Sequence, residues 1–146
     1  MQREKTLRAI QSFLRQMEAD NEADECKLFF RFQELQKRET FEKTIQTYYQ
    51  GNAKKVALCG RKSFTCLTEP LYYWFCRPTE AFNPKKDTSF YHQPIIQFIT
   101  LLERLIDKEE VFLYGVDVLQ PFYGSFTEHY VLVEGECMYV LHFTIV

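Results

Sequence analysis

Asp117 and His142 are the residues of this chain whose types and positions best suit acid–base chemistry. Asp117 falls within the apolar stretch VFLYGVDVL (111–119), and His142 falls within the closing stretch CMYVLHFTIV (137–146). Each is a polar residue on the less apolar side of a predicted strand. If the two strands are neighbours, the carboxylate and the imidazole form an acid–base pair lining a concave sheet. The alternative is a half-exposed histidine and a strand-edge aspartate without chemistry, because periodicity alone does not bring them together.

A metal centre or other cofactor is not indicated. The one cysteine–histidine set that can be drawn has spacings that match no usual zinc pattern: Cys59, Cys66, Cys76 and His92. His129 follows Glu128 in a segment that reads as a solvated turn, although a general-base role is also open. The five cysteines include no CxxC pair. We therefore expect reduced, mostly buried thiols in a cytoplasmic protein, with a nuclear location also compatible.

A basic cluster raises a third kind of chemistry, the binding of single-stranded nucleic acid. The cations lie on both sides of a predicted strand–turn–strand: Lys54, Lys55, Arg61 and Lys62. With aromatic residues 72–74 nearby they could form a stacking platform. The formal net charge of the chain is −2, which argues against a nucleic-acid partner and favours a solvated hairpin tip.

Composition predicts one ordered domain over residues 1–146. The chain is 46% hydrophobic and 16% aromatic, and it contains five glycines and five prolines, too few for a long linker. No apolar run is long enough to span a membrane, and the charged N-terminal stretch lacks the apolar core of a secretory signal. Phosphate-binding loops, nucleophile elbows and zincin motifs are absent from the sequence, which argues against an enzyme.

The first half of the chain reads as mostly helical. Leu7, Ile10, Leu14 and Met17 recur at helical spacing and predict a helix over 3–19. Residues 26–50 are expected to be helical with a break near Glu39-Thr40, although the aromatics of 27–33 also suit a strand. Residues 54–67 read as two short strands about a turn at Cys59–Lys62, and LYYWFC (71–76) as a strand or packed extended segment.

The second half predicts a helix laid across an antiparallel sheet. The helix is expected to begin at Pro94 and run to residue 108, with one wide apolar face. Strands follow at 111–119, from Tyr130 to Val133, and from Met138 to Val146. In the last strand two rows alternate, an apolar one and a mixed one: Tyr139, Leu141, Phe143 and Ile145 against Met138, Val140, His142 and Thr144. The fold class is therefore α+β, with N-terminal helices and one long helix packed on a curved antiparallel sheet.

The last third of the chain resembles the nuclear transport factor 2-like superfamily. The likeness lies in FTEHYVL (126–132), similar to the penultimate strand of that fold, in MYVLH (138–142), similar to its final strand, and in DVLQP (117–121). The order of helices followed by long antiparallel strands is similar too. The resemblance implies a curved sheet with helices in its concave side. It does not imply one function, because the family includes transport adaptors, enzymes and small-molecule binders.

The preferred functional hypothesis is a non-catalytic protein-binding module of the adaptor or inhibitor type. The expected partner-binding residues are aromatics beside predicted loops: Tyr72, Tyr73, Trp74, Phe90, Tyr91, Phe122 and Tyr123. Exposed aromatic patches commonly anchor interfaces. The alternatives are rings that merely cap the core, and a small-molecule or enzymatic pocket containing Asp117 and His142. A free edge on the C-terminal strand would also permit a homodimer.

Overall fold

The computed structural model of the protein describes residues 2–22, 27–76, 88–119 and 126–145, and for residues 88–92 it describes the backbone only. The elements follow one another as α1 (Gln2–Asn21), β1 (Leu28–Leu35), α2 (Phe41–Tyr48), β2 (Ala53–Arg61), a 3₁₀ turn η1 (Thr65–Leu67), α3 (Thr68–Phe75), α4 (Thr88–Leu105), β3 (Phe112–Val118), β4 (Thr127–Glu134) and β5 (Cys137–Ile145). Within these residues the strands form one antiparallel sheet in the order β1-β5-β4-β3-β2. The predicted α+β class is confirmed.

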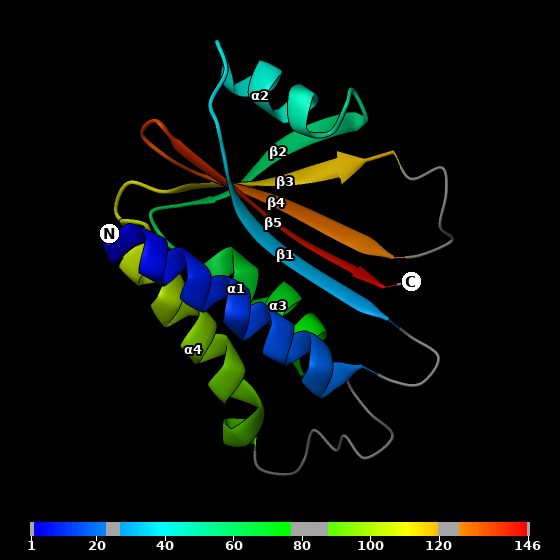
Figure 1. Ribbon diagram of the computed structural model, residues 1–146, viewed down its shortest axis with the longest axis vertical. Helices are drawn as coiled ribbons and strands as arrows, with labels where there is room; N and C mark the ends of the chain where they lie inside the picture. Colours follow the sequence, from blue (N-terminus) through cyan, green and yellow to red (C-terminus); the bar gives the residue numbers. More distant parts are fainter. Residues whose placement is uncertain (1, 23–26, 77–87, 120–125, 146) are drawn as a thin grey trace.

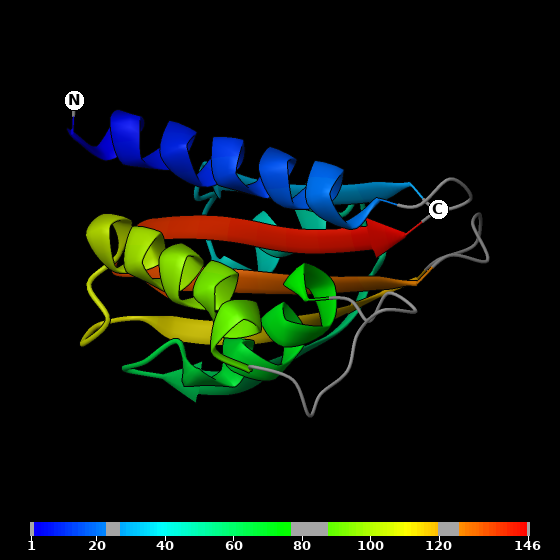
Figure 2. The same cartoon turned by 90° about the horizontal axis from the view of Figure 1, so that it is seen from below.

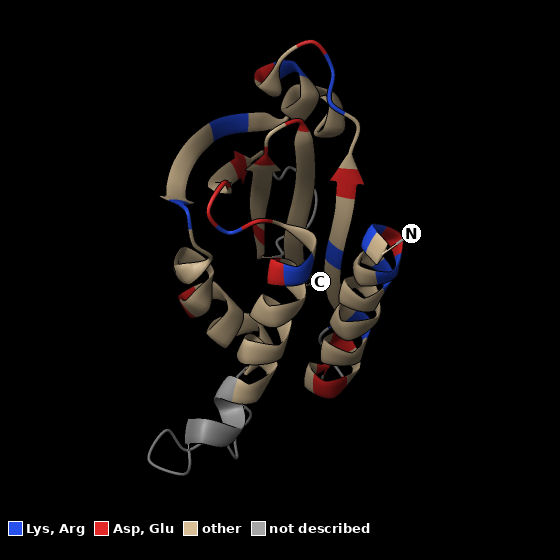
Figure 3. Ribbon diagram, turned by 90° about the vertical axis from the view of Figure 1, so that its left-hand side faces the viewer, with Lys and Arg blue, Asp and Glu red and all other residues tan. Residues whose placement is uncertain are grey.

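The helices divide unequally between the two faces of the sheet. Helices α1, α3 and α4 cover one face, called here the helix face, while α2 lies on the other side of the strands (Figures 1 and 2). Helix α4 carries no charged residue before Glu103 and Arg104, whereas α1 carries charges along its length (Figure 3). The apolar character of α4 agrees with the prediction of a helix laid across the sheet.

The core of the helix face is built from the row of β5 that the sequence predicts. Tyr139, Leu141 and Phe143 are each at most 1% exposed. They meet buried residues that recur every three or four positions along the helices: Ile10, Leu14 and Met17 of α1, Leu71, Trp74 and Phe75 of α3, and Ile95, Phe98 and Leu102 of α4. The predicted alternation of β5 and the predicted apolar stripes of the first and last helices are confirmed.

A second, smaller core lies under α2. It joins Ile45 and Tyr49 to Val116, Val131 and Val140. Helix α2 begins after Thr40, whose hydroxyl accepts a hydrogen bond from the backbone N–H of Lys43 at 3.1 Å. The predicted break near Glu39-Thr40 is therefore confirmed. The preferred prediction of a helix is wrong for residues 28–35. This segment is a strand, as in the alternative interpretation, since Leu28, Phe30 and Phe32 are buried in alternation.

Three further elements differ from the sequence prediction. Residues 71–76 are not a strand, because Leu71, Trp74 and Phe75 are buried at helical spacing and Pro70 falls in the first turn of α3, where its missing N–H does no harm. Helix α4 begins at Thr88 rather than at Pro94, so the proline lies inside it. The predicted pair of short strands about a turn at Cys59–Lys62 is wrong: β2 continues as one strand to Arg61, with a bulge between Leu58 and Gly60, and Thr65–Leu67 form η1 in place of the second strand.

The edges of the sheet are β1 and β2, so the prediction of a free edge at the C-terminal strand is wrong: β5 lies between β1 and β4. Helix α1 caps the β1 edge. The carboxylate of Glu18 accepts a hydrogen bond from Phe30 N at 3.2 Å, and the amide of Gln11 donates to Phe32 O at 3.0 Å. These side chains already form hydrogen bonds with backbone groups of β1 to which another strand would otherwise bind.

Removing both caps should therefore promote self-association. We expect the double variant Gln11→Ala/Glu18→Ala to shift toward a larger species as concentration rises, measured by sedimentation velocity. The matched control is Glu4→Ala/Arg8→Ala, which removes an exposed pair from the same helix without touching β1. If both double variants sediment like the unaltered protein at every concentration, the two side chains do not protect the edge.

Candidate functional site

The structure separates Asp117 from His142. Val116 pairs with His129, and His129 pairs with His142, so these three side chains share one face of the sheet. Asp117 is the next residue along β3 and points to the opposite, helix face. Because β4 also lies between their strands, the predicted acid–base pair is not assembled.

His142 instead belongs to a cluster with His129 on the face that carries α2. The two imidazoles stack with ring centroids 5.1 Å apart and an angle of 18° between their planes. The Tyr49 hydroxyl lies 3.1 Å from His129 Nδ1, and the Thr127 hydroxyl lies 2.9 Å from His129 Nε2. His129 is thus held on both nitrogens within β4, not in a solvated turn.

Burial sets the charge state of this histidine pair. It lowers the pKa of His129 to about 4, with a further contribution from His142. It also lowers the pKa of His142 to about 4, with a further contribution from the Arg31 guanidinium, which lies opposite on β1. Both rings are therefore neutral at pH 7. The Nδ1 atom of His142 is buried and has no hydrogen-bond partner among the described residues.

Asp117 lies in a polar row that crosses the helix face of β2, β3 and β4. Lys55 pairs with Asp117, and the register places Glu128 of β4 on the far side of Asp117. The Tyr130 hydroxyl donates a short hydrogen bond to the Glu128 carboxylate. Burial, and then this bond, raise the pKa of Tyr130 far above its ordinary value, so the phenol stays protonated as a donor.

An open cleft of about 360 Å³ follows this row. It is lined by Lys55, Ala57, Gly115, Val116, Asp117, Thr127, Glu128, His129 and Tyr130. Its floor is open at Gly115, where an added Cβ would have no heavy atom within 4 Å. The cleft could hold a small polar ligand against two carboxylates, an ammonium and a phenol. The cleft contains Asp117, one of the two residues of the hypothetical small-molecule pocket. His142, the other residue, does not line the cleft, and Glu128 and Tyr130 lie there instead.

An aromatic cluster, formed by Tyr73, Trp74, Phe126 and Phe143, lies at the end of the sheet where β4 begins and β5 ends. Trp74 stacks between Phe143, at 5.4 Å and 16°, and Phe126, at 5.7 Å and 20°. Tyr73 meets the Phe126 ring edge-on at 5.9 Å. Trp74 and Phe143 are fully buried, whereas Phe126 is 50% and Tyr73 is 41% exposed. Two solvent-facing rings thus rest on a buried stack.

The predicted aromatic residues have different outcomes. Tyr73 is exposed and Tyr72 is half-buried. Trp74 is buried, so the prediction of an exposed ring there is wrong, because helix α3 turns this side chain onto β5. Phe122, Tyr123 and the side chains of Phe90 and Tyr91 lie outside the described part of the structure. The sequence reasoning missed Phe126, which was assigned to a strand and not to the surface.

The predicted nucleic-acid site and the cysteine–histidine metal site do not form among the described residues. The basic residues split between the two ends of β2, with Lys55 and Arg61 roughly 20 Å apart at the usual strand rise, and Trp74 is too buried to stack with a base. No group of three metal-ligating side chains occurs among the described residues. The described cysteines are less buried than expected: Cys59 is exposed, Cys66 and Cys137 are half-buried, and Cys76 is buried.

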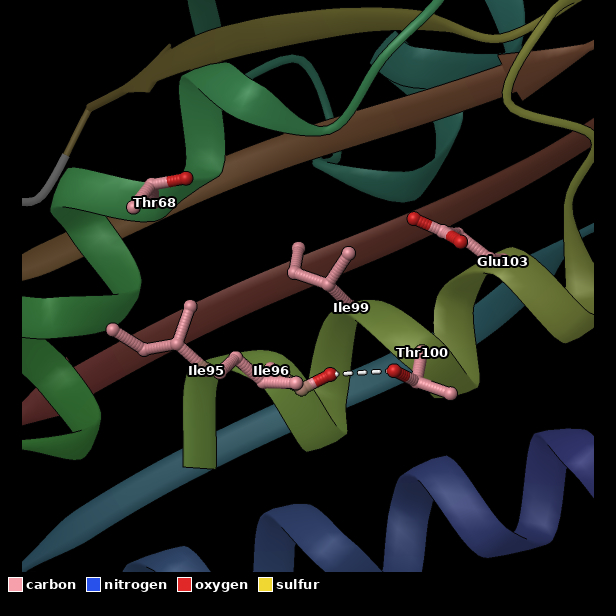
Figure 4. A pocket seen from close by; sticks show the side chains of 6 residues that line it. All are labelled: Thr68, Ile95, Ile96, Ile99, Thr100 and Glu103. Carbon is pink, nitrogen blue, oxygen red and sulfur yellow. Dashed lines mark hydrogen bonds between the residues drawn. The ribbon is translucent and has the colours of Figure 1, made fainter. Parts of the chain in front are cut away.

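A groove of about 440 Å³ between α3 and α4 is mainly aliphatic (Figure 4). Ile95, Ile96 and Ile99 line it from α4, and Thr68 lines it from α3. The Thr100 hydroxyl donates to the carbonyl of Ile96 at 2.8 Å, so it offers no free donor there. The groove thus provides mainly apolar contact area, with the carboxylate of Glu103 as the one ionisable group among its described lining residues.

Comparison with known proteins finds no family model, no curated protein and no solved structure that matches the chain. The resemblance to nuclear transport factor 2-like proteins therefore stays a prediction. Among the described residues, no helix combines the length and the apolar character needed to cross a bilayer.

The histidine pair makes stability depend on pH in a defined window. An unfolded histidine has a pKa of about 6.5, so between about pH 6.5 and 4 the unfolded chain binds protons that the folded chain does not. The free energy of unfolding should fall as pH falls through this window, by up to about 1.4 kcal/mol per pH unit for each ring. Well above pH 6.5, where the imidazoles of the unfolded chain are neutral as well, the pair should contribute no slope.

Urea unfolding at a series of pH values measures this slope. The double variant His129→Gln/His142→Gln should lose the part of the slope that the two rings contribute, whatever its absolute stability. His92 remains in both proteins and serves as the internal reference. An unchanged slope in the double variant would show that the two imidazoles are not buried in neutral form.

Proposed function

We propose that this protein is a non-catalytic module that binds another protein through the exposed rings of Tyr73 and Phe126. The observation that carries the proposal is that these two rings contact each other at the surface while resting on the buried Trp74–Phe143 stack. Exposed aromatic residues are frequent anchors of protein interfaces. Rings already held in place lose little conformational freedom when a partner binds.

The surroundings of the cluster define the kind of partner. Phe126 immediately precedes β4, Glu128 follows two residues later on the helix face of that strand, and Asp117 lies next to Glu128 on β3. The matching surface would carry an apolar side chain that packs on the two rings and a basic side chain beside it. A cytoplasmic or nuclear location fits the solvent-facing thiol of Cys59, since such thiols persist in reducing compartments.

A second candidate function is binding of a small polar ligand in the cleft along Lys55, Asp117 and Glu128. The observation in its favour is the open space above Gly115 beside the Tyr130–Glu128 hydrogen bond. Gly115→Val would fill this space without a close contact at Cβ. If binding survives Gly115→Val but is lost in Phe126→Ala, the function belongs to the two rings. If binding survives Phe126→Ala but is lost in Gly115→Val, the function belongs to the cleft.

Loss of either ring should weaken the partner complex. A photoreactive phenylalanine analogue at position 73 captures the partner in a native lysate, and calorimetry then gives its Kd for purified variants. We expect Phe126→Ala to raise the Kd at least about thirty-fold, the effect typical of a central aromatic anchor.

Phe112→Ala is the matched control. Phe112 is 40% exposed but stands at the opposite end of the sheet, at the start of β3. It should leave the Kd within about twofold, the size of an energetically neutral contact. Equal weakening by the two substitutions, or capture of the same protein by the analogue at position 112, contradicts the proposed surface.

A further inference from the structure

Cys59 and Cys66 are brought together by an irregularity in β2. Leu58 pairs with Tyr114 and Gly60 pairs with Leu113, so Cys59 is the extra residue of a bulge. A bulge redirects a side chain that regular alternation would place elsewhere. The Cys59 sulfur comes to lie 3.5 Å from the sulfur of Cys66, which belongs to η1, and 3.4 Å from the carbonyl of Leu113.

The neighbouring residue makes room for this approach. A Cβ added to Gly60 would lie only 2.9 Å from the sulfur of Cys66, so a side chain at position 60 would push the second cysteine away. Cys59 is exposed and Cys66 is half-buried, which leaves the pair within reach of a small reagent from solvent. Three features thus coincide: two sulfurs almost in contact, clearance at residue 60, and access.

We propose that Cys59 and Cys66 form a redox-modification site, in which a hydroperoxide-class oxidant converts the two thiols into a reversible intramolecular disulfide. A disulfide requires the sulfurs to close to about 2.05 Å. The displacement needed is therefore about 1.5 Å, which a side-chain rotation in a half-exposed 3₁₀ turn can supply.

The electrostatics assign the roles of the two thiols. The hydrogen bond from Cys66 lowers the pKa of the Cys59 thiol to about 7, so Cys59 is the nucleophile. The same bond, with burial, raises the pKa of Cys66, which stays protonated and acts as the resolving thiol. Near neutral pH a larger fraction of Cys59 is therefore thiolate than for a thiol of ordinary pKa.

The reaction balances in two steps. The Cys59 thiolate attacks one peroxide oxygen, an S–O bond forms, the O–O bond breaks, and the departing hydroxide takes a proton to become water. Cys59 is oxidised by two electrons to the sulfenic acid. The Cys66 sulfur then attacks the Cys59 sulfur; the S–S bond forms, the S–O bond breaks, and the hydroxyl leaves with the Cys66 proton as water. Two equivalents of a small thiol restore the reduced pair by exchange.

Hydrogen peroxide titration of the full chain, followed by alkylation and peptide mass analysis, tests the site. One equivalent should remove the alkylatable thiols of Cys59 and Cys66 together and yield a peptide linked between them, reversed by dithiothreitol. Cys76 and Cys137 should keep their alkylatable thiols after denaturation and serve as internal controls. Conversion of Cys59 to the sulfinic acid while Cys66 stays alkylatable would overturn the proposal.

Two substitutions of Cys66 separate the hydrogen bond from the disulfide. Cys66→Ala removes the donor, so the pH midpoint for iodoacetamide alkylation of Cys59 should rise and its rate at pH 7 should fall roughly tenfold. Cys66→Ser retains a donor hydroxyl, so the alkylation rate should fall less, while peroxide should leave a sulfenic acid that dimedone traps. An unchanged rate in Cys66→Ala, or a disulfide to another cysteine in Cys66→Ser, would overturn the assignment of roles.

Discussion

The pairing of β5 with both β1 and β4 is the constraint on which the rest of the structure depends. Strand β1 is held in the sheet only through β5, more than one hundred residues later in the chain. The helix-facing row of β5 supplies Tyr139, Leu141 and Phe143, against which all the helices of that face pack. A strand that is both paired on two sides and buried on one face must be apolar, which explains the composition of the last segment of the sequence.

The other face of β5 follows a different rule, because α2 covers only part of the sheet. Met138 and Val140 lie under α2, whereas His142 and Thr144 lie beyond it. The part of this face that α2 does not cover can therefore carry polar side chains. His129 and His142 are still buried enough there that burial lowers the pKa of both, and they stack as neutral rings. The histidines of the closing hairpin thus share the second face of the sheet, and His142 does not line the helix-side cleft, which His129 borders.

Local pattern predicted much of the fold and little of the site. The two-residue period of β5 and the spacing of Leu7 to Met17 were sufficient, because side-chain direction follows directly from position in a strand or helix. For residues 71–76 the β preference of aromatic residues outweighed the spacing of Leu71, Trp74 and Phe75. Asp117 and His142 could not be assigned to opposite faces, since strand order and register arise from pairing over long distances. The Cys59–Cys66 contact depends on a bulge, for which one sequence offers no clear signal.

One member of the thiol pair and two members of the aromatic cluster belong to the same continuous segment, η1 followed by α3. Cys66 is in η1, which continues directly into α3, and α3 carries Tyr73 and Trp74. A helix of eight residues is about 12 Å long and moves as one body. Trp74, however, is clamped between Phe143 and Phe126. A rotation of the Cys66 side chain within η1 can supply the roughly 1.5 Å needed to reach disulfide distance, so α3 would have to move only by the part that this rotation does not supply. The rings are the exposed members of the stack and have the least packing to lose, so any part of the shift that η1 does not absorb would change their position before it disturbs the buried core.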